Sequence, residues 1–239
     1  MANNLQQYSE LADVWWSDNS PFQDLVHLNP IRFEYFDRFV DEWSGKSVLD
    51  LGCGGGFVAE ELARRGAHVT GLDPSAPLLN VARNHAAKSS LKIDYKLGSG
   101  EKIPADDASF DVVVCVDVLE HVEDLEQVLS EVRRVLKPDG WFVYDTINRT
   151  VFSFLWMIVA LEWLSGRIPR GTHDWRKFIR PQEMKSLLVK HGFSSVGQVG
   201  LRVARFRLSA FKVTPEFKIS ERQSCLYAGV AIRLANDAS

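Results

Sequence analysis

The sequence predicts an α/β fold with a doubly wound, mostly parallel sheet, and three observations lead to this prediction. Short runs rich in β-branched residues alternate with amphipathic segments between Ser47 and Thr146, a pattern typical of βαβ units. A glycine-rich turn at 52–56 follows the first of these runs, where such folds place a ligand-binding loop. The 239 residues, 46% hydrophobic and 25% charged, provide enough apolar material for one domain of this size.

The sheet region has its elements in a regular order. Its clearest helix is 122–136, whose apolar residues recur at spacings of three and four and form one stripe. Lys137 to Gly140 then ends this helix and turns the chain. We expect strands over 47–51, 67–73, 91–97, 110–116 and 140–146, and helices over 57–66, 77–88 and 122–136.

The two ends of the chain and one insertion complete the expected organisation, which remains one domain. Residues 1–45 are expected to form a helical cover and 46–146 a ligand-binding core. An insertion at 147–195 begins with an apolar segment and ends with a second helix. The last part, 196–239, is expected to complete the sheet with some antiparallel pairing, through strands at 196–203, 206–214 and 226–233.

Charge and composition exclude several classes of protein. The net charge of −3 argues against a protein that coats nucleic acid, because phosphate binding needs a basic surface. Three scattered cysteines are too few for a disulfide framework or a four-cysteine zinc site. The first residues contain no cationic start and no apolar run, so we expect no signal peptide and a cytoplasmic location.

The residues of the glycine-rich turn limit the classes of ligand that it can bind. A dinucleotide fingerprint would need glycine at position 57, which is phenylalanine, and the Gly-Lys-Ser/Thr of a phosphate-binding loop is absent. What remains is Asp50 followed by Gly52, Gly54 and Gly56. This arrangement resembles motif I of the class I S-adenosylmethionine-dependent methyltransferases. The resemblance implies a Rossmann-like, seven-stranded sheet whose glycine loop packs against the methionine end of the cofactor.

Asp73 supplies a second expected anchor for the cofactor. It ends the second strand about 20 residues beyond the glycine loop, where a carboxylate reaches ribose hydroxyls at the carboxyl edge of the sheet. The alternative is that Asp73, Pro74 and Ser75 only cap the next helix. The helix start after the glycine loop would also favour an anion.

Two further cofactor contacts are implied by the resemblance. The turn after the third strand, with Gly100 and Glu101, matches the adenine-contacting turn of that family, and a solvated loop is the alternative. Cys115 and Val116 end the fourth strand, where the family places residues against the cofactor. Core packing is their alternative role.

Asp117, Glu120 and His121 form an acidic and histidine cluster just after that strand. If the segment is helical, the three share one face. They are candidate ligands for Mg²⁺, Mn²⁺ or Zn²⁺, which would stabilise the phenolate of a catechol. His121 could instead act as a general base. The remaining alternative is that the acids complement a helix N-terminus.

The flanking motifs resemble those of the ubiquinone-biosynthesis O-methyltransferases, which methylate hydroxyls of polyprenylated catechol-type rings. The resemblance implies that Arg32 binds the cofactor, whose carboxylate a guanidinium can grip. It also implies that His173 is a second acceptor-site group or a loop-holding residue. The tail after Gly200 departs from the family pattern, which leaves the acceptor open. The matching stretches are Trp15-Trp16, 27–32, 48–56, 117–122, 146–149 and 170–181.

The apolar segment Val151–Leu164 contains one charge, Glu162. It is shorter than the roughly 20 residues that span a bilayer, and an all-round apolar helix is expected to bury itself. Core packing, an apolar acceptor pocket and a membrane surface are the three alternatives. Arg149, Arg167 and Arg170 flank the segment, as expected for contact with anionic headgroups at the inner face of the membrane.

We therefore expect an S-adenosyl-L-methionine-dependent O-methyltransferase that acts on a small aromatic or polyprenylated acceptor and does not bind nucleic acid. Three alternatives stay open. They are a methyltransferase of the same fold with another acceptor, an NAD(P)-dependent oxidoreductase, and a non-catalytic lipid-binding member of the fold.

Overall fold

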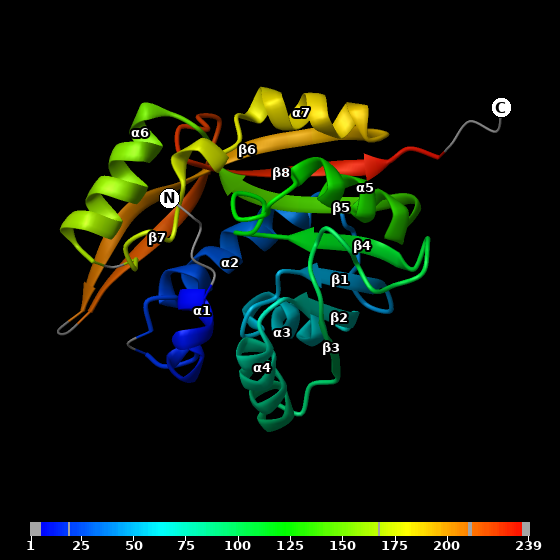
Figure 1. Cartoon of the computed structure of the whole chain (residues 1–239), viewed down its shortest axis with the longest axis horizontal. Helices are drawn as coiled ribbons and strands as arrows, with labels where there is room; N and C mark the ends of the chain where they lie inside the picture. Colours follow the sequence, from blue (N-terminus) through cyan, green and yellow to red (C-terminus); the bar gives the residue numbers. More distant parts are fainter. Residues whose placement is uncertain (1–5, 19, 167, 210–211, 236–239) are drawn as a thin grey trace.

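The computed structural model describes residues 6–18, 20–166, 168–209 and 212–235. Its core is a sheet with strand order β3-β2-β1-β4-β5-β8-β6-β7 (Figure 1). Neighbouring strands are parallel from β3 to β5, and β8, β6 and β7 pair antiparallel. The strands are β1 (Ser47–Leu51), β2 (His68–Asp73), β3 (Ile93–Leu97), β4 (Phe110–Cys115), β5 (Leu136–Ile147), β6 (Phe193–Ser209), β7 (Lys212–Ser220) and β8 (Leu226–Arg233).

The doubly wound α/β prediction is confirmed, and the sheet has eight strands, as many as the sequence patterns predict, whereas the family resemblance implies seven. The difference arises in the tail. Strand β6 pairs with β8 only as far as Leu201, and its backbone continues to Ser209 as a hairpin with β7. The expected strands at 196–203 and 206–214 are therefore parts of one longer strand and its partner.

Helices cover both faces of the sheet. One face carries α2 (Gln23–Phe36), α3 (Phe57–Arg64) and α4 (Ala76–Lys88), and the other carries α5 (Leu125–Val135) and α7 (Pro181–Lys190). Successive strand residues serve the two cores alternately: Val114 packs with the first group and Val113 with the second, because side chains alternate across a strand.

Local chemistry explains the boundaries of α5. Asp124 caps its start by accepting a hydrogen bond from the Gln127 backbone N–H at 3.0 Å. The helix ends at Val135, and Leu136 is already extended and pairs with Phe110 of β4. Strand β5 thus begins at Leu136, before the turn that was expected at 137–140. Within that range only Asp139 has a left-handed backbone (φ 58°).

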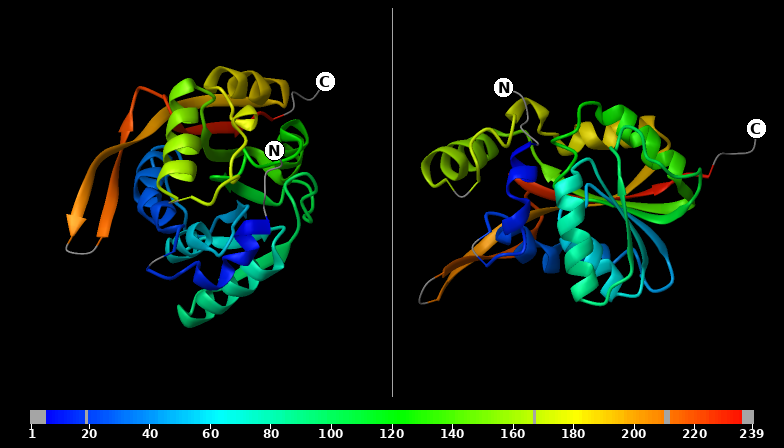
Figure 2. Two further views of the ribbon diagram at one scale, coloured as in Figure 1. Left: turned by 60° about the vertical axis from the view of Figure 1, so that its left-hand side comes forward. Right: turned by 60° about the horizontal axis from the view of Figure 1, so that its bottom comes forward.

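The N-terminal segment lies across the carboxyl edge of the sheet. It contains α1 (Gln6–Glu10) and a 3-10 turn, η1 (Ala12–Val14), before α2. The Trp15 ring packs with Phe22, Phe57 and Leu78, so the segment is anchored on α3 and α4. Figure 2 shows this blue segment beside the start of α4.

Of the three alternatives for the apolar segment Val151–Leu164, complete core packing is wrong: one side of the segment lines a cavity and the other is exposed. One short turn, α6 (Val151–Ser153), leads into η2 (Phe154–Leu164), which is wound as a π-helix. Within η2 only Met157 and Glu162 are buried. The exposed large side chains of the insertion are Val151, Phe152, Phe154, Leu155, Trp163 and Leu164. None of the helices in the described part of the chain is long and apolar enough to cross a membrane.

The insertion and the β6–β7 hairpin project beyond the same end of the sheet, as the right-hand view of Figure 2 shows. Strand pairing explains this arrangement. Ile147, the last residue of β5, and Leu201 of β6 both pair with Leu226 of β8. The chain on either side therefore leaves the sheet at the carboxyl end of β5, with the short 3-10 turn η3 (Trp175–Lys177) returning the insertion to α7.

Candidate functional site

One large cavity of about 1070 Å³ opens at the carboxyl ends of the parallel strands. It exceeds the roughly 300–1,000 Å³ typical of a site for one small molecule, so it has room for two ligands side by side. The glycine loop and Asp73 lie at one end of its lining, and the insertion and the hairpin at the other. The N-terminal segment contributes Gln7, Tyr8 and Trp15 to the wall.

The glycine loop is shaped by backbone geometry that favours glycine. Gly52, Gly54 and Gly56 have φ of 76°, 51° and 96°, in the left-handed region. Trp15 lies directly on the loop, because a Cβ added at Gly54 or Gly55 would stand 2.8 or 2.3 Å from its ring atoms. Gly52 and Gly54 line the cavity, whereas Gly56 supports the turn behind it.

Asp50 carries an unsatisfied acceptor beside this loop. The carboxylate is buried and lines the cavity, and its Oδ2 has no hydrogen-bond partner within the described residues. Burial, and secondarily the charge of Asp73, raises its pKa to about 7. A cationic donor in the cavity would satisfy this oxygen and restore the charged form, because an opposite charge favours ionisation.

Asp73 is held in place by two backbone amides. Its Oδ2 accepts from the Gly54 N–H and its Oδ1 from the Ser75 N–H, both at 2.8 Å. Helix α4 is capped by Ser75, whose hydroxyl accepts from the Leu78 N–H. A carboxylate has about four acceptor sites, so Asp73 keeps capacity for hydroxyl donors while lining the cavity.

The other predicted cofactor residues divide into two groups. Pro74, Gly100, Glu101 and Val116 line the cavity together with Asp50 and Asp73. Cys115 does not: it is fully buried in the core beneath α5. Its alternative role, core packing, is the one its position supports.

Arg32 is buried in an ion-pair network. Its Nε donates to Asp145, its Nη2 to Asp117, and its Nη1 to Asn29 Oδ1 at 3.1 Å. Three of the five guanidinium N–H groups are thus engaged by protein. The side chain also lines the cavity, so the predicted cofactor role and the observed network involve the same group.

The acidic cluster lies on turns and not on the helix face that the sequence suggested. Asp117 has a left-handed backbone (φ 55°), and its N–H donates to Asp145 Oδ1 at 2.8 Å. Strained non-glycine backbone of this kind is concentrated at functional sites. Glu120 accepts from the Thr146 hydroxyl at 2.8 Å. Burial, reinforced by the Asp117 charge, raises the Glu120 pKa to about 8, so Glu120 is mostly protonated at neutral pH.

The cluster does not form a ready ligand set for a metal. No group of three or more His, Cys, Asp or Glu side chains in the described ranges is arranged to hold a metal ion. Asp117 is already committed to Arg32, and Glu120 favours its protonated form, whereas a ligand must be deprotonated. Asp117, Glu120 and His121 therefore do not fit a divalent metal as they stand.

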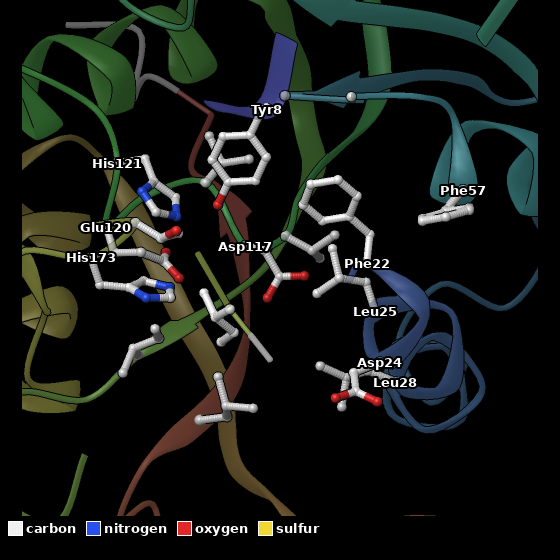
Figure 3. Close-up of a pocket in the computed structure, with 18 of the residues that line it drawn as sticks. Tyr8, Phe22, Asp24, Leu25, Leu28, Phe57, Asp117, Glu120, His121 and His173 are labelled. Carbon is white, nitrogen blue, oxygen red and sulfur yellow. The ribbon is translucent and has the colours of Figure 1, made fainter. Parts of the chain in front are cut away.

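His121 and His173 lie next to each other on one wall of the acceptor end of the cavity. Their ring centroids are 5.3 Å apart, and Figure 3 shows both rings beside Glu120 and opposite Asp117. Burial, and then the charges of His173 and Lys177, lower the pKa of His121 to about 3. His121 is consequently neutral and weakly basic.

His173 is oriented by a buried carboxylate. Its Nδ1 lies 2.7 Å from Glu162 Oε1, which also accepts from the His173 backbone N–H at 3.0 Å. Glu162 Oε2 accepts from the Gly171 N–H at 2.8 Å. A carboxylate only accepts, so Nδ1 carries a proton and Nε2 is the basic nitrogen of the neutral ring.

Sequence reasoning missed several residues of the site. Glu162 is the one charge of an apolar run in the sequence. This pattern indicates a residue with a specific partner, because a buried charge needs one. Asp145, which binds Arg32, and Tyr8, which lies over His121, give no signal in the sequence, since only the fold brings them to these partners.

Comparisons with known proteins agree with this geometry. A family model described as a methyltransferase domain matches residues 49–144. The ubiquinone biosynthesis O-methyltransferase of Marinobacter nauticus is 42% identical over 189 residues, covering 78% of this chain and 79% of the relative. The protein of the same name from Nitrosomonas europaea is 39% identical over 198 residues, covering 82% and 84%.

Solved structures show the same fold at low identity. A SAM-dependent methyltransferase from Aquifex aeolicus matches with a TM-score of 0.58 at 18% identity, over 85% of this chain and 89% of that chain. The YcgJ protein from Bacillus subtilis matches with a TM-score of 0.63 at 17% identity, over 86% and 99%.

Proposed function

The chain belongs to the family of the ubiquinone biosynthesis O-methyltransferases, and on that premise we propose that it methylates a phenolic hydroxyl of a polyprenylated catechol-type ring with S-adenosyl-L-methionine. The observation that carries this proposal is the single continuous cavity. It joins the glycine loop, Asp50 and Asp73 to the His121–His173 pair, so donor and acceptor can meet within one cavity.

The residues at the glycine end fit the cofactor. The orphaned Asp50 Oδ2 would accept from its ammonium group, and Asp73 from its ribose hydroxyls. The remaining N–H groups of Arg32 would meet its carboxylate, and Gly100, Glu101 and Val116 would line its adenine side. When bound, S-adenosyl-L-methionine supplies an electrophilic methyl group on sulfur.

At the acceptor end, His173 is the favoured base of the two predicted histidines. Glu162 fixes its ring and keeps the proton on Nδ1, so that Nε2 can take a proton from a phenolic hydroxyl. The weakly basic His121 serves better as a wall and hydrogen-bonding neighbour. Holding the deprotonated oxygen in line with the methyl group supplies the rest of the rate enhancement through positioning.

A divalent metal at Asp117, Glu120 and His121 was the finer expectation, and the donor arrangement gives it no support. The mechanism above therefore takes no step through a metal. Turnover before and after chelation tests the point: we expect EDTA-treated enzyme to retain its rate, and a loss restored by Mg²⁺, Mn²⁺ or Zn²⁺ would reinstate the metal.

We also propose that the insertion contacts a membrane surface, where a long-tailed acceptor resides. Its support is the exposed apolar face of α6 and η2, in which Val151 and Leu164 are 71% and 80% exposed. Contiguous exposed apolar surface of this kind marks an interaction site. Arg170 lies 4.9 Å from the Trp163 ring centroid, a pairing common at interfaces. Arg149 is paired with Glu183 at the surface, and Arg167 lies outside the described residues.

A direct experiment tests the main proposal. The protein is incubated with methyl-deuterated S-adenosyl-L-methionine and a polyprenylated catechol, and the product is analysed by mass spectrometry. We expect one labelled methyl group on a ring oxygen. Unchanged catechol in the presence of confirmed cofactor binding would contradict the proposal.

A second acceptor class is favoured by one observation. The hairpin residues Arg202, Arg205 and Phe206, in the stretch that departs from the family pattern, line the cavity. Another small aromatic or lipid acceptor would therefore meet a wall peculiar to this chain. A panel of phenols and lipids, run with the same labelled cofactor, separates the two candidates.

A further inference from the structure

Tyr8 lies over the acceptor end of the cavity, on the short N-terminal helix α1. It lines the cavity together with Asp117, Glu120, His121 and His173. Figure 3 shows its hydroxyl pointing toward the space between these four side chains. No part of the mechanism above uses this group.

The Tyr8 ring is held by two aromatic contacts. It stacks on Phe22 with centroids 5.5 Å apart and an interplanar angle of 23°. It meets His121 edge-on at 5.9 Å and 76°. These contacts fix the ring plane, so the direction of the hydroxyl is set before a ligand arrives.

The helix that carries Tyr8 is tied to both halves of the cavity through the two neighbouring residues. The Gln7 side-chain amide donates to the Arg170 carbonyl at 3.1 Å, on the acceptor-side insertion. The Ser9 hydroxyl lies 2.7 Å from the Ser75 hydroxyl, on the cofactor side. Tyr8 is therefore positioned relative to cofactor and acceptor at once.

The surroundings of Tyr8 make its hydroxyl a permanent donor. A tyrosine ordinarily keeps its proton at neutral pH. Burial, and then the charges of Glu120, Asp117 and Glu162, raises the Tyr8 pKa far above its ordinary value. Asp117 is an acceptor and His173 presents a basic nitrogen, and both line the cavity. An incoming hydroxyl thus finds two acceptors and needs a donor for its own lone pairs.

We propose that Tyr8 recognises the second hydroxyl of a vicinal diol, by donating a hydrogen bond to the ring oxygen next to the one that is methylated. This inference rests on the proposed function and assigns a specificity residue to it. His173 serves the oxygen that reacts, and Tyr8 holds its neighbour. A ring with one hydroxyl leaves the Tyr8 donor unpaired in the cavity, and a site built to bond a hydroxyl discriminates strongly against the analogue that lacks it.

The test compares Tyr8→Phe with wild type and with the matched control Tyr35→Phe. The Phe variant keeps the ring that packs on Phe22 and His121, and Tyr35 is a buried core residue of α2 that does not line the cavity. For each protein we measure kcat/KM for a polyprenylated catechol and the inhibition constant of the matching monophenol. Calorimetry with S-adenosyl-L-methionine monitors the cofactor site.

We expect Tyr8→Phe to lower kcat/KM for the catechol by about 10- to 100-fold, the range for one hydrogen bond to a charged or strongly polar partner. The monophenol should inhibit Tyr8→Phe as tightly as wild type or more tightly, because no donor is left unpaired. Cofactor affinity should stay within about twofold of wild type, and Tyr35→Phe should change none of the three values.

Three results would overturn the inference: an unchanged catechol rate in Tyr8→Phe, an equal loss for catechol and monophenol, or a parallel loss of cofactor affinity. The last two would show a structural role. If wild-type protein itself fails to methylate any catechol, the proposed function fails, and that outcome is distinct from a wild type that works equally well without the Tyr8 hydroxyl.

Discussion

Glu162 controls both the position and the tautomer of His173. It is the one charge of an apolar run, yet it is buried and accepts from the His173 ring, the His173 backbone and the Gly171 backbone. This set of bonds both holds the loop and selects the tautomer of the histidine. Removing one of its oxygens should therefore affect catalysis and local order together.

Replacing Glu162 by Gln is expected to lower kcat by about 10- to 100-fold, because the amide no longer enforces a proton on Nδ1 of His173. Steady-state kinetics at saturating cofactor checks this expectation. Glu183→Gln, at an exposed ion pair with Arg149, is the control and should keep the wild-type rate. A fully active Glu162→Gln enzyme would rule out His173 as the oriented base.

Glu120 should make the free energy of unfolding depend on pH. Its folded pKa, about 8, lies above the ordinary value of 4.5. The folded state thus holds a proton that the unfolded chain releases between those values, and stability falls as pH rises through this window. Glu120→Gln should remove about 1 kcal/mol of this loss per pH unit. Urea melts of both proteins from pH 5 to about pH 8 measure the difference, and parallel curves would contradict the assignment.

At the scale of elements, Arg32 joins α2 to the ends of β4 and β5. Its partner Asp117 lies just after β4 and its partner Asp145 lies in the neighbouring strand β5, so one arginine of α2 neutralises two carboxylates at the sheet edge. Breaking such a buried network leaves uncompensated charge. Helix α2 and the ends of β4 and β5 therefore stabilise one another, and the cofactor-binding edge of the sheet depends on α2.

Arg32→Met is expected to destabilise the fold by about 3–5 kcal/mol, the cost of stranding buried carboxylates. Chemical denaturation measures this change. Arg38→Met removes an exposed ion pair with Glu34 on the same helix and should cost less than about 1 kcal/mol. Equal losses of unfolding free energy in the two variants would show that the buried network stabilises the fold no more than an exposed ion pair does.

The exposed apolar side chains of η2 lead to a prediction about membrane binding. Leu155 and Leu164 are 53% and 80% exposed and do not line the cavity. The double variant Leu155→Ser/Leu164→Ser should float several-fold less with anionic vesicles, while methylation of a short-tailed catechol is unchanged. Val189→Ser, at an exposed site on α7, is the matched control. Equal flotation of all three proteins, or none by wild type, would remove the membrane contact.

At the scale of the whole molecule, cofactor binding should stabilise the fold by mass action. At 100 times the dissociation constant the gain is about 2.7 kcal/mol, or roughly 5–10 °C in Tm for a chain of this size. Thermal melts with S-adenosyl-L-methionine should show this shift, and melts with NADH should show none. A shift with NADH alone would favour the oxidoreductase alternative.

Most of the sheet could be predicted from sequence because its signals are local. β1 coincides with its predicted range, and β2, β3, β4 and α4 differ by one or two residues, since β-branched runs and glycine turns report directly on backbone preference. The glycine loop, Asp73 and His121 are predicted from the same kind of local signal, and they converge in one cavity because parallel strands end at a common edge. His173 is implied only by the family resemblance, and it reaches the cavity from the insertion.

What the sequence determined by itself was the α/β sheet, the methyltransferase family and the positions of the cofactor loop and of Asp73. Only the tertiary structure decided that the apolar insertion stays exposed, that β6 continues into an eighth-strand hairpin, and that Asp117 is bound by Arg32 and not arranged with its neighbours for a metal. It also brought Tyr8 over His121 and Glu162 to His173. Backbone propensity and periodicity act between near neighbours in the chain. Burial, ion pairing and side-chain orientation depend on residues far apart in sequence, which meet only when the chain has folded.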